Sequence, residues 1–316
     1  MAFSRVFATS PVVQWKLAQP QTYLALCAML TGVLVYLVRF LVAESFSVPL
    51  LVHILSWLLL FVSPFLAIYC AEDTASTKLT SLALAFFVPF NLMNLFYEGF
   101  FFLFLAVVTF LWIWCESGLS FYDTFHSHLA LDLTQTELNP SKLPTFNLVH
   151  IRRPVFYVFL LIFSFFGTGN IASINTFDPL SIYCFMTVLN PATMGPMMIL
   201  KLLCPMAMVG TGYAAIHRIC AAHVNTTASR ASVNTIQENK IHTTVLLVIA
   251  NFLAVHFFLM LRDEGSWLDI GSSISHYVIA MAIGLASLLL ALAGGWMMGS
   301  STAVHIGRPE GLGKFD

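Results

Sequence analysis

Charged side chains are scarce in this sequence. Only 9% of its 316 residues are Asp, Glu, Lys or Arg, whereas 59% are hydrophobic and the mean hydropathy is +0.85. Because soluble domains carry roughly a quarter charged residues, this composition excludes an ordinary soluble domain and indicates a polytopic membrane protein. The net charge of -1 lacks the basic excess of a nucleic-acid-binding surface, so we predict no nucleic-acid partner.

Paired cysteines and familiar catalytic motifs are also missing. The cysteines stand singly, and no CxxC pair occurs, which argues against a disulfide framework and a zinc knuckle. The glycine-rich stretch GTGNIASINTFD lacks the lysine of a phosphate-binding P-loop. No nucleophile, base and orienting residue can be grouped on one side of the membrane. The sequence therefore predicts no catalytic residue, no metal site and no cofactor in this chain.

Long apolar runs are what the sequence has instead. A helix needs about 20 apolar residues to cross the hydrocarbon, and eight runs approach or exceed that length: 21–43, 49–70, 79–95, 98–115, 154–167, 193–216, 241–261 and 273–297. A shorter run, 179–191, ends in Asn190-Pro191 and predicts a re-entrant or interfacial helix; a full span over 180–200 is the alternative. The expected fold is an all-α membrane bundle of about eight spanning helices plus this short helix.

Lysine and arginine positions predict the orientation, because cytosolic loops carry an excess of both. With the N-terminus in the cytosol, the opposite side holds only Arg262, and the cytosolic side holds Arg5, Lys16, Lys78, Lys142, Arg152, Arg153, Arg218, Arg230, Lys240, Arg308 and Lys314. The expected organisation is a cytosolic N-terminus (1–20), one membrane domain (21–297) with cytosolic loops 116–153 and 217–240 and lumenal loops 167–178 and 262–272, and a cytosolic tail (298–316). The sequon at Asn225 then lies in the cytosol and stays unmodified.

The first lumenal loop, GTGNIASINTFD, is dense in Gly, Ser, Thr and Asn. Its backbone N–H groups are suited to a phosphate, especially near Asp178-Pro179, which reads as the N-cap and first residue of a helix. A tight turn between two helices is the alternative. The candidate headgroup-binding or docking residues here are Gly167, Thr168, Gly169, Asn170, Asn175 and Asp178.

The second lumenal loop lies within RDEGSWLDIGSSISHYV (262–278). Gly265 and Gly271 permit turns, Ser272 or Ser273 is expected to cap the last helix, and a tryptophan suits the bilayer interface. A solvated loop that packs on a neighbouring lumenal domain is the alternative to a headgroup site. The candidates here are Arg262, Asp263, Trp267, Asp269, Ser272 and His276.

His256 is a further candidate, because it lies deep in the 241–261 span, where polar groups are costly. It is expected either to pack as a hydrogen-bonded histidine or to contact a lipid headgroup.

Two segments resemble the C-terminal membrane domain of the GPI ethanolamine phosphate transferase 1 family: FFGTGNIASINTFDPLSIYCFMTVLNP (165–191) and AVHFFLMLRDEGSWLDIGSSISHYVI (254–279). The resemblance extends over roughly 154–297, and the first 150 residues agree only in hydropathy. It implies a multi-pass protein of the endoplasmic reticulum membrane. It also implies an enzyme that transfers phosphoethanolamine from phosphatidylethanolamine to the first mannose of the GPI precursor.

The resemblance further implies a partner for this chain. In the family, a large lumenal domain of alkaline-phosphatase type, with a threonine nucleophile and zinc, performs the transfer, and this chain has no globular stretch long enough for it. We therefore expect the chain to bind the lipid substrates and to dock that domain. The alternatives are a lipid or solute transporter or scramblase, because a short helix and a proline-kinked span are typical of discontinuous helices, and a non-catalytic subunit of a membrane enzyme complex.

Overall fold

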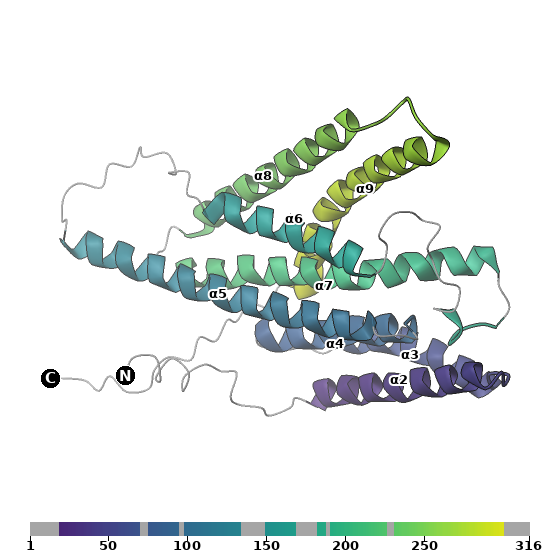
Figure 1. The fold of residues 1–316 in the computed structure, drawn as a ribbon. Helices are drawn as coiled ribbons and strands as arrows, with labels where there is room; N and C mark the ends of the chain where they lie inside the picture. Colours follow the sequence, from purple (N-terminus) through teal and green to yellow (C-terminus); the bar gives the residue numbers. More distant parts are fainter. Residues whose placement is uncertain are drawn as a thin grey trace.

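The computed structural model describes residues 19–69, 75–94, 98–133, 149–168, 182–187, 190–225 and 231–299. Most of these residues form helices, joined by short turns, and none of them forms a strand (Figure 1). The helices are α2 (Gln19–Ala43), α3 (Leu50–Tyr69), α4 (Ala75–Leu92), α5 (Glu98–Leu133), α6 (Val149–Gly167), α7 (Pro191–Asn225), α8 (Ala231–Leu259) and α9 (Trp267–Met298). Each predicted span corresponds to one of them, so the prediction of an all-α bundle of about eight helices is confirmed.

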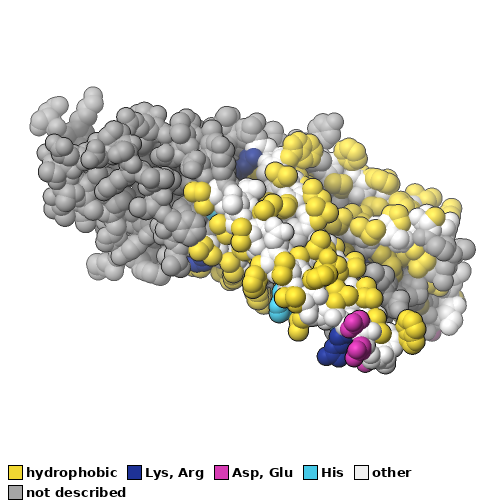
Figure 2. Space-filling model, turned by 90° about the horizontal axis from the view of Figure 1, so that it is seen from above, with side chains coloured by type: hydrophobic (Ala, Val, Ile, Leu, Met, Phe, Trp, Pro, Cys, Tyr) yellow, Lys and Arg dark blue, Asp and Glu magenta, His cyan; other side chains and the backbone are white. Residues whose placement is uncertain are grey.

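Six of these helices are long and apolar enough to cross a membrane: α2, α3, α5, α7, α8 and α9. The other two are shorter or more polar, since α4 has 18 residues and a lysine in its first turn, and α6 begins with the sequence VHIRRP. Large apolar side chains such as Met29, Phe100 and Phe252 are more than 70% exposed, which suits a surface that faces lipid. Figure 2 shows hydrophobic side chains over much of the described surface, with a small group of charged side chains at one edge.

Helix α7 lies at the centre and contacts α4, α5, α6, α8 and α9 (Figure 1). Helices α2, α3 and α4 pack together on one side of it, and α8 pairs with α9 on the other. The larger core cluster surrounds α7 with fully buried side chains such as Leu105, Tyr157 and Val209. This arrangement leaves the connection between α8 and α9 at the outer end of a helical hairpin.

Glycines allow α7 to approach its neighbours closely. A Cβ atom at Gly294 of α9 would lie 2.5 Å from the carbonyl oxygen of Gly210 in α7. A Cβ atom at Gly212 would collide with Cγ2 of Thr109 in α5. Since lipid tails give helices no hydrophobic reason to associate, such close contact between small residues supplies much of the packing energy.

The run 179–191, predicted as a short helix, is a single turn where the structure describes it. Residues 182–187 contain backbone hydrogen bonds from Phe185 N (2.8 Å) and Met186 N (3.1 Å) to Ile182 O. Two side chains of α3 hold this turn from the side: His53 Nδ1 lies 3.0 Å from Cys184 O, and Trp57 Nε1 donates to Phe185 O at 3.3 Å. Tertiary contacts with α3 therefore take the place of regular helical bonds.

Helix α7 begins at the predicted break, where the side chain of Asn190 accepts a hydrogen bond from Ala192 N at 3.1 Å. Helices α5 and α7 also continue well beyond the spans predicted for them, to Leu133 and Asn225. Part of each predicted cytosolic loop is therefore helical, because a helix satisfies its own backbone in water as well as in lipid.

Candidate functional site

The connection between α8 and α9 is built around a helix cap. Gly265 adopts a φ of +119°, a conformation that favours glycine, and Ser266 follows it as the N-cap of α9. The Ser266 hydroxyl accepts from Asp269 N at 3.3 Å and donates to Asp269 Oδ2 at 2.8 Å. These contacts start α9 at Trp267 and fix the direction in which its first turns leave the loop.

The prediction that Ser272 or Ser273 caps this helix is wrong. Both lie inside α9, where their hydroxyls donate to Asp269 O (3.0 Å) and Ile270 O (2.9 Å). Gly271, predicted to permit a turn, is also helical. The spacing of Ser266 and Asp269 matches a serine N-cap with an acidic residue three positions later, so the correct signal was present in the sequence.

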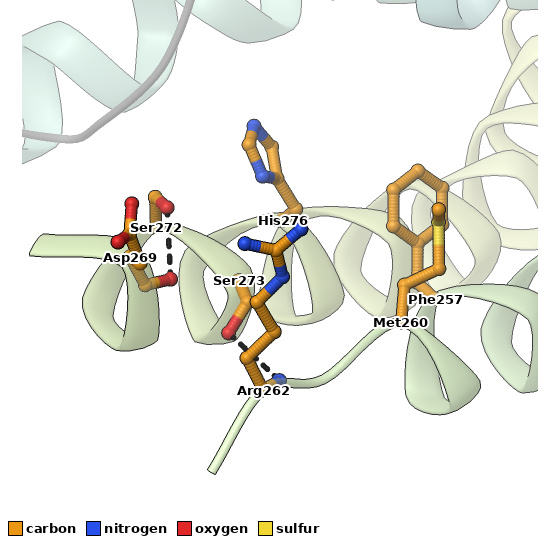
Figure 3. Close-up of a pocket in the computed structure, with 7 residues that line it drawn as sticks. All are labelled: Phe257, Met260, Arg262, Asp269, Ser272, Ser273 and His276. Carbon is orange, nitrogen blue, oxygen red and sulfur yellow. Dashed lines mark hydrogen bonds between the residues drawn. The ribbon is translucent and has the colours of Figure 1, made fainter. Parts of the chain in front are cut away.

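A pocket of about 300 Å³ lies where the end of α8 faces the first three turns of α9 (Figure 3). Asp269, Ser272, Ser273 and His276 share one face of α9, because residues three and four apart on a helix are neighbours. Arg262 is held against this face by its backbone N–H, which donates to Ser273 Oγ at 3.2 Å. The residues that line the pocket are Phe257, Met260, Arg262, Asp269, Ser272, Ser273 and His276.

The pocket has a charged part and an apolar part. Figure 3 shows the Arg262 side chain extending beside His276, with Asp269 on one side and Phe257 and Met260 on the other. A guanidinium presents several N–H donors in a fork that matches phosphate oxygens, and a carboxylate is an acceptor for an ammonium group. The arrangement is therefore suited to a ligand with a phosphate, an amine and an apolar body.

Four of the predicted candidates meet in this pocket: Arg262, Asp269, Ser272 and His276. The exposed Asp263 is not among the residues that line it, and neither is Trp267, which is 91% exposed. The prediction missed Phe257, Met260 and Ser273. The first two were detectable, because they lie three residues apart and so share a face at the end of the α8 sequence.

His256 lies outside the pocket. It is exposed on α8, and its ring meets that of Phe257 edge-on with the centroids 5.6 Å apart.

The structure describes only the start of the loop 167–178, which was predicted to be lumenal. Gly167 ends α6, and a Cβ atom there would collide with the ring of Phe101 in α5, so this glycine has a packing role. The buried Thr168 donates its hydroxyl hydrogen to Phe165 O at 2.8 Å. Gly169, Asn170, Asn175 and Asp178 lie outside the described residues, so their phosphate-binding role stays a prediction.

The zinc implied by the family resemblance has no matching ligand set in the part of the chain that the structure describes. No three His, Cys, Asp or Glu side chains lie together among these residues in a way that could hold a metal ion. We therefore derive no chemical step through a metal in this chain.

Three ion pairs between helices, two of them sharing Glu116, were not anticipated from the sequence. Glu116 of α5 accepts from Arg152 at 3.0 and 2.8 Å and from Arg153 at 3.0 Å, which ties α5 to the start of α6. Lys201 of α7 lies 2.7 Å from Glu98 at the start of α5. In each ion pair the two residues come from different helices. No local sequence pattern therefore marks them.

The helical bundle, its apolar outer surface and the charged pocket at one end define a multi-pass membrane protein. The chain belongs to the family described as phosphatidylinositolglycan class N (PIG-N), whose model matches residues 2–266. The likeness therefore includes the first 150 residues, where the sequence indicated agreement in hydropathy alone. The resemblance inferred from 165–191 and 254–279 is confirmed.

Three relatives named GPI ethanolamine phosphate transferase 1 illustrate the match. The mouse protein is 35% identical over 296 residues, which cover 87% of this chain and 29% of the relative. The human protein is 34% identical over 274 residues (84% and 28%), and that of Yarrowia lipolytica is 29% identical over 268 residues (83% and 26%). The chain thus spans less than a third of the length of these curated relatives. No solved structure matches it significantly.

Proposed function

We propose that this chain is the membrane part of a phosphoethanolamine transferase of GPI-anchor biosynthesis, located in the endoplasmic reticulum membrane. The complete enzyme transfers phosphoethanolamine from phosphatidylethanolamine to the first mannose of the GPI precursor. Membership of the PIG-N family and the shared name of the relatives support this role. The proposal for the whole enzyme extends to a lumenal alkaline-phosphatase-type domain, with a threonine nucleophile and zinc, that performs the transfer.

Within that enzyme, the pocket between α8 and α9 holds a phosphoethanolamine headgroup. The observation that carries this proposal is that Arg262 and Asp269 line one pocket, so opposite charges face the same ligand. The guanidinium binds the phosphate and the carboxylate binds the ammonium group, while Phe257 and Met260 contact the glycerol and the first acyl carbons. Exposed apolar residues of α8, including Val255 and Phe258, continue this surface toward the acyl chains.

The same end of the hairpin docks the catalytic domain. Trp267 and Leu268 are 91% and 82% exposed at the first turn of α9, next to the pocket. Exposed aromatic and aliphatic side chains are the usual anchors of a protein interface. A domain docked here meets a headgroup that is already oriented, and positioning of that kind contributes about 7–11 kcal/mol in favourable cases.

The headgroup role is tested in cells that lack the mouse relative. This chain is expressed with the remainder of that enzyme, and surface GPI-anchored proteins are measured by flow cytometry. We expect the wild-type chain to restore them, and the double variant Arg262→Gln, Asp269→Asn to lower recovery about tenfold, as the loss of charge-assisted bonds predicts. Glu264→Gln, an exposed neighbour outside the pocket, is the matched control.

Two results would count against this role. If the double variant recovers as well as the control, the pocket does not hold the headgroup. If the wild-type chain fails where the intact mouse enzyme succeeds, this chain does not serve as the membrane part.

The docking role has a separate test. Trp267→Ala with Leu268→Ala should abolish co-purification with the remainder of the enzyme, whereas Leu285→Ala, a 62% exposed residue elsewhere on α9, should not. Equal co-purification of the two variants would refute docking at this surface.

A further inference from the structure

We infer that a second pocket, between α7, α8 and α9 and away from the hairpin tip, binds the phosphate of an anionic phospholipid. Its volume is about 400 Å³. It lies near the end of α7, the first membrane-spanning turns of α8 and the end of α9. The residues that line it are Tyr213, Ala214, His217, Arg218, His242, Thr243, Leu246, Leu288, Ala291, Leu292 and Gly295.

One side of this pocket is rich in hydrogen-bond donors. The rings of His217 and His242 meet edge-on with their centroids 4.5 Å apart, and Tyr213 stands 4.5 Å from His217 on the other side. His242 is only 3% exposed, so its ring forms part of the floor. Imidazole N–H groups and a phenol hydroxyl are suitable partners for phosphate oxygens.

Arg218 supplies a permanent positive charge beside these rings. Its Nη2 donates to Gly295 O of α9 at 2.7 Å, which holds the guanidinium at the pocket and leaves it with four further N–H donors by its chemistry. None of the described residues that line the pocket is acidic. The pocket therefore favours an anion.

The opposite side of the pocket is apolar and opens on the exposed apolar surface of α9. Leu246 is buried at 2% exposure, whereas Leu292 is 72% exposed and Thr243 is also exposed at the edge. A ligand that enters past Leu292 comes from the lipid phase, and Leu288 lies inside along the same helix. Because the entrance is apolar and the opposite wall carries the polar donors, the pocket favours a phosphate that carries acyl chains over a free phosphate ion.

Basic pockets between membrane helices on the cytoplasmic side are a known type of site for anionic lipid headgroups. The lysine and arginine distribution predicts that this end of the bundle faces the cytosol. This site is separate from the proposed phosphoethanolamine pocket. It lies at the opposite end of the α8–α9 hairpin, and it is suited to a lipid with a net negative charge instead of a zwitterionic headgroup.

The test uses the full chain reconstituted in phosphatidylcholine vesicles with a trace of photoreactive lipid. The probes are phosphatidic acid and phosphatidylcholine that carry the same diazirine-bearing acyl chain, and labelled peptides are mapped by mass spectrometry. We expect phosphatidic acid to label the peptides that contain Leu246, Leu288 and Leu292 in preference to phosphatidylcholine. Arg218→Gln should lower this labelling about tenfold, the change expected from losing one charge-assisted hydrogen bond.

Two controls keep the test decisive. Arg39→Gln, which changes an exposed arginine of α2, should leave the labelling unchanged. Leu292→Trp should block the entrance while Arg218 stays in place, and it should therefore also lower labelling by phosphatidic acid. This variant replaces Arg218→Gln if the latter fails to fold. Equal labelling by the two lipids would overturn the inference. If phosphatidic acid does not label these peptides, but millimolar radioactive inorganic phosphate binds the wild-type chain and not Arg218→Gln, the pocket belongs to a free anion and the lipid is overturned.

Discussion

Lys201 of α7 and Glu98 of α5 form an ion pair 2.7 Å long, although they lie 103 positions apart in the sequence. Both side chains are largely buried, with exposures of 15% and 24%. Each charge is tolerated with so little exposure to solvent because the opposite charge compensates it. The pair joins α7, the central helix, to the start of α5.

Breaking this pair on one side should destabilise the bundle. We expect Lys201→Met to lower the free energy of unfolding by about 1–3 kcal/mol, because it leaves a carboxylate without its partner. The double variant Lys201→Met, Glu98→Gln should recover most of the loss. Thermal unfolding in detergent measures both, and additive losses in the double variant would show that the two residues are not coupled.

Two adjacent glycines of α9 should respond differently to the same substitution. A Cβ atom at Gly294 meets Gly210 O at 2.5 Å, whereas one at Gly295 meets nothing within 4 Å. Gly294→Ala should therefore cost about 1–3 kcal/mol through overpacking. Gly295→Ala should be neutral, or stabilising by up to about 1 kcal/mol, because alanine favours the helix. Unfolding in detergent separates them, and similar stabilities would mean that α7 and α9 do not approach through Gly294.

The cap of α9 predicts a difference between two serines. Ser266→Ala removes the N-cap hydroxyl and should cost about 1 kcal/mol locally, whereas Ser272→Ala removes only a hydroxyl that bonds within the helix. Hydrogen exchange of the amides in the first turn of α9 should accelerate about fivefold in the first variant and little in the second. Faster exchange in Ser272→Ala than in Ser266→Ala would place the cap at the later serine.

The orientation predicted from charge is open to a direct check. Asn225, at the end of α7, belongs to a glycosylation sequon that should stay unmodified, because the lysine and arginine distribution predicts a cytosolic position for it. We expect the chain expressed in mammalian cells to show no change in mobility after glycosidase treatment, and Asn225→Gln to migrate like the wild type. A glycosidase-sensitive shift that Asn225→Gln abolishes would invert the orientation of α7 and α8.

The pocket between α8 and α9 was partly readable from the sequence. Asp269, Ser272 and His276 are close in the chain, and helical periodicity alone places them on one face of α9. Arg262 joins them only because Gly265 turns the backbone and Ser266 starts the helix at the following residue. Taking Ser272 or Ser273 instead of Ser266 as the cap left the first residues of α9 out of the predicted helix, although the four residues still proved to be neighbours.

The order of residues was enough to predict an all-α membrane bundle, the positions of its spans and the family to which the chain belongs. Hydropathy carries that information because each helix satisfies its own backbone hydrogen bonds and must be apolar over the bilayer thickness. Which polar groups meet became clear from the folded arrangement of the helices. His217 and His242, or Glu98 and Lys201, come together because close glycine contacts and ion pairs set how the helices pack, and interactions between distant residues leave no local periodicity in the chain.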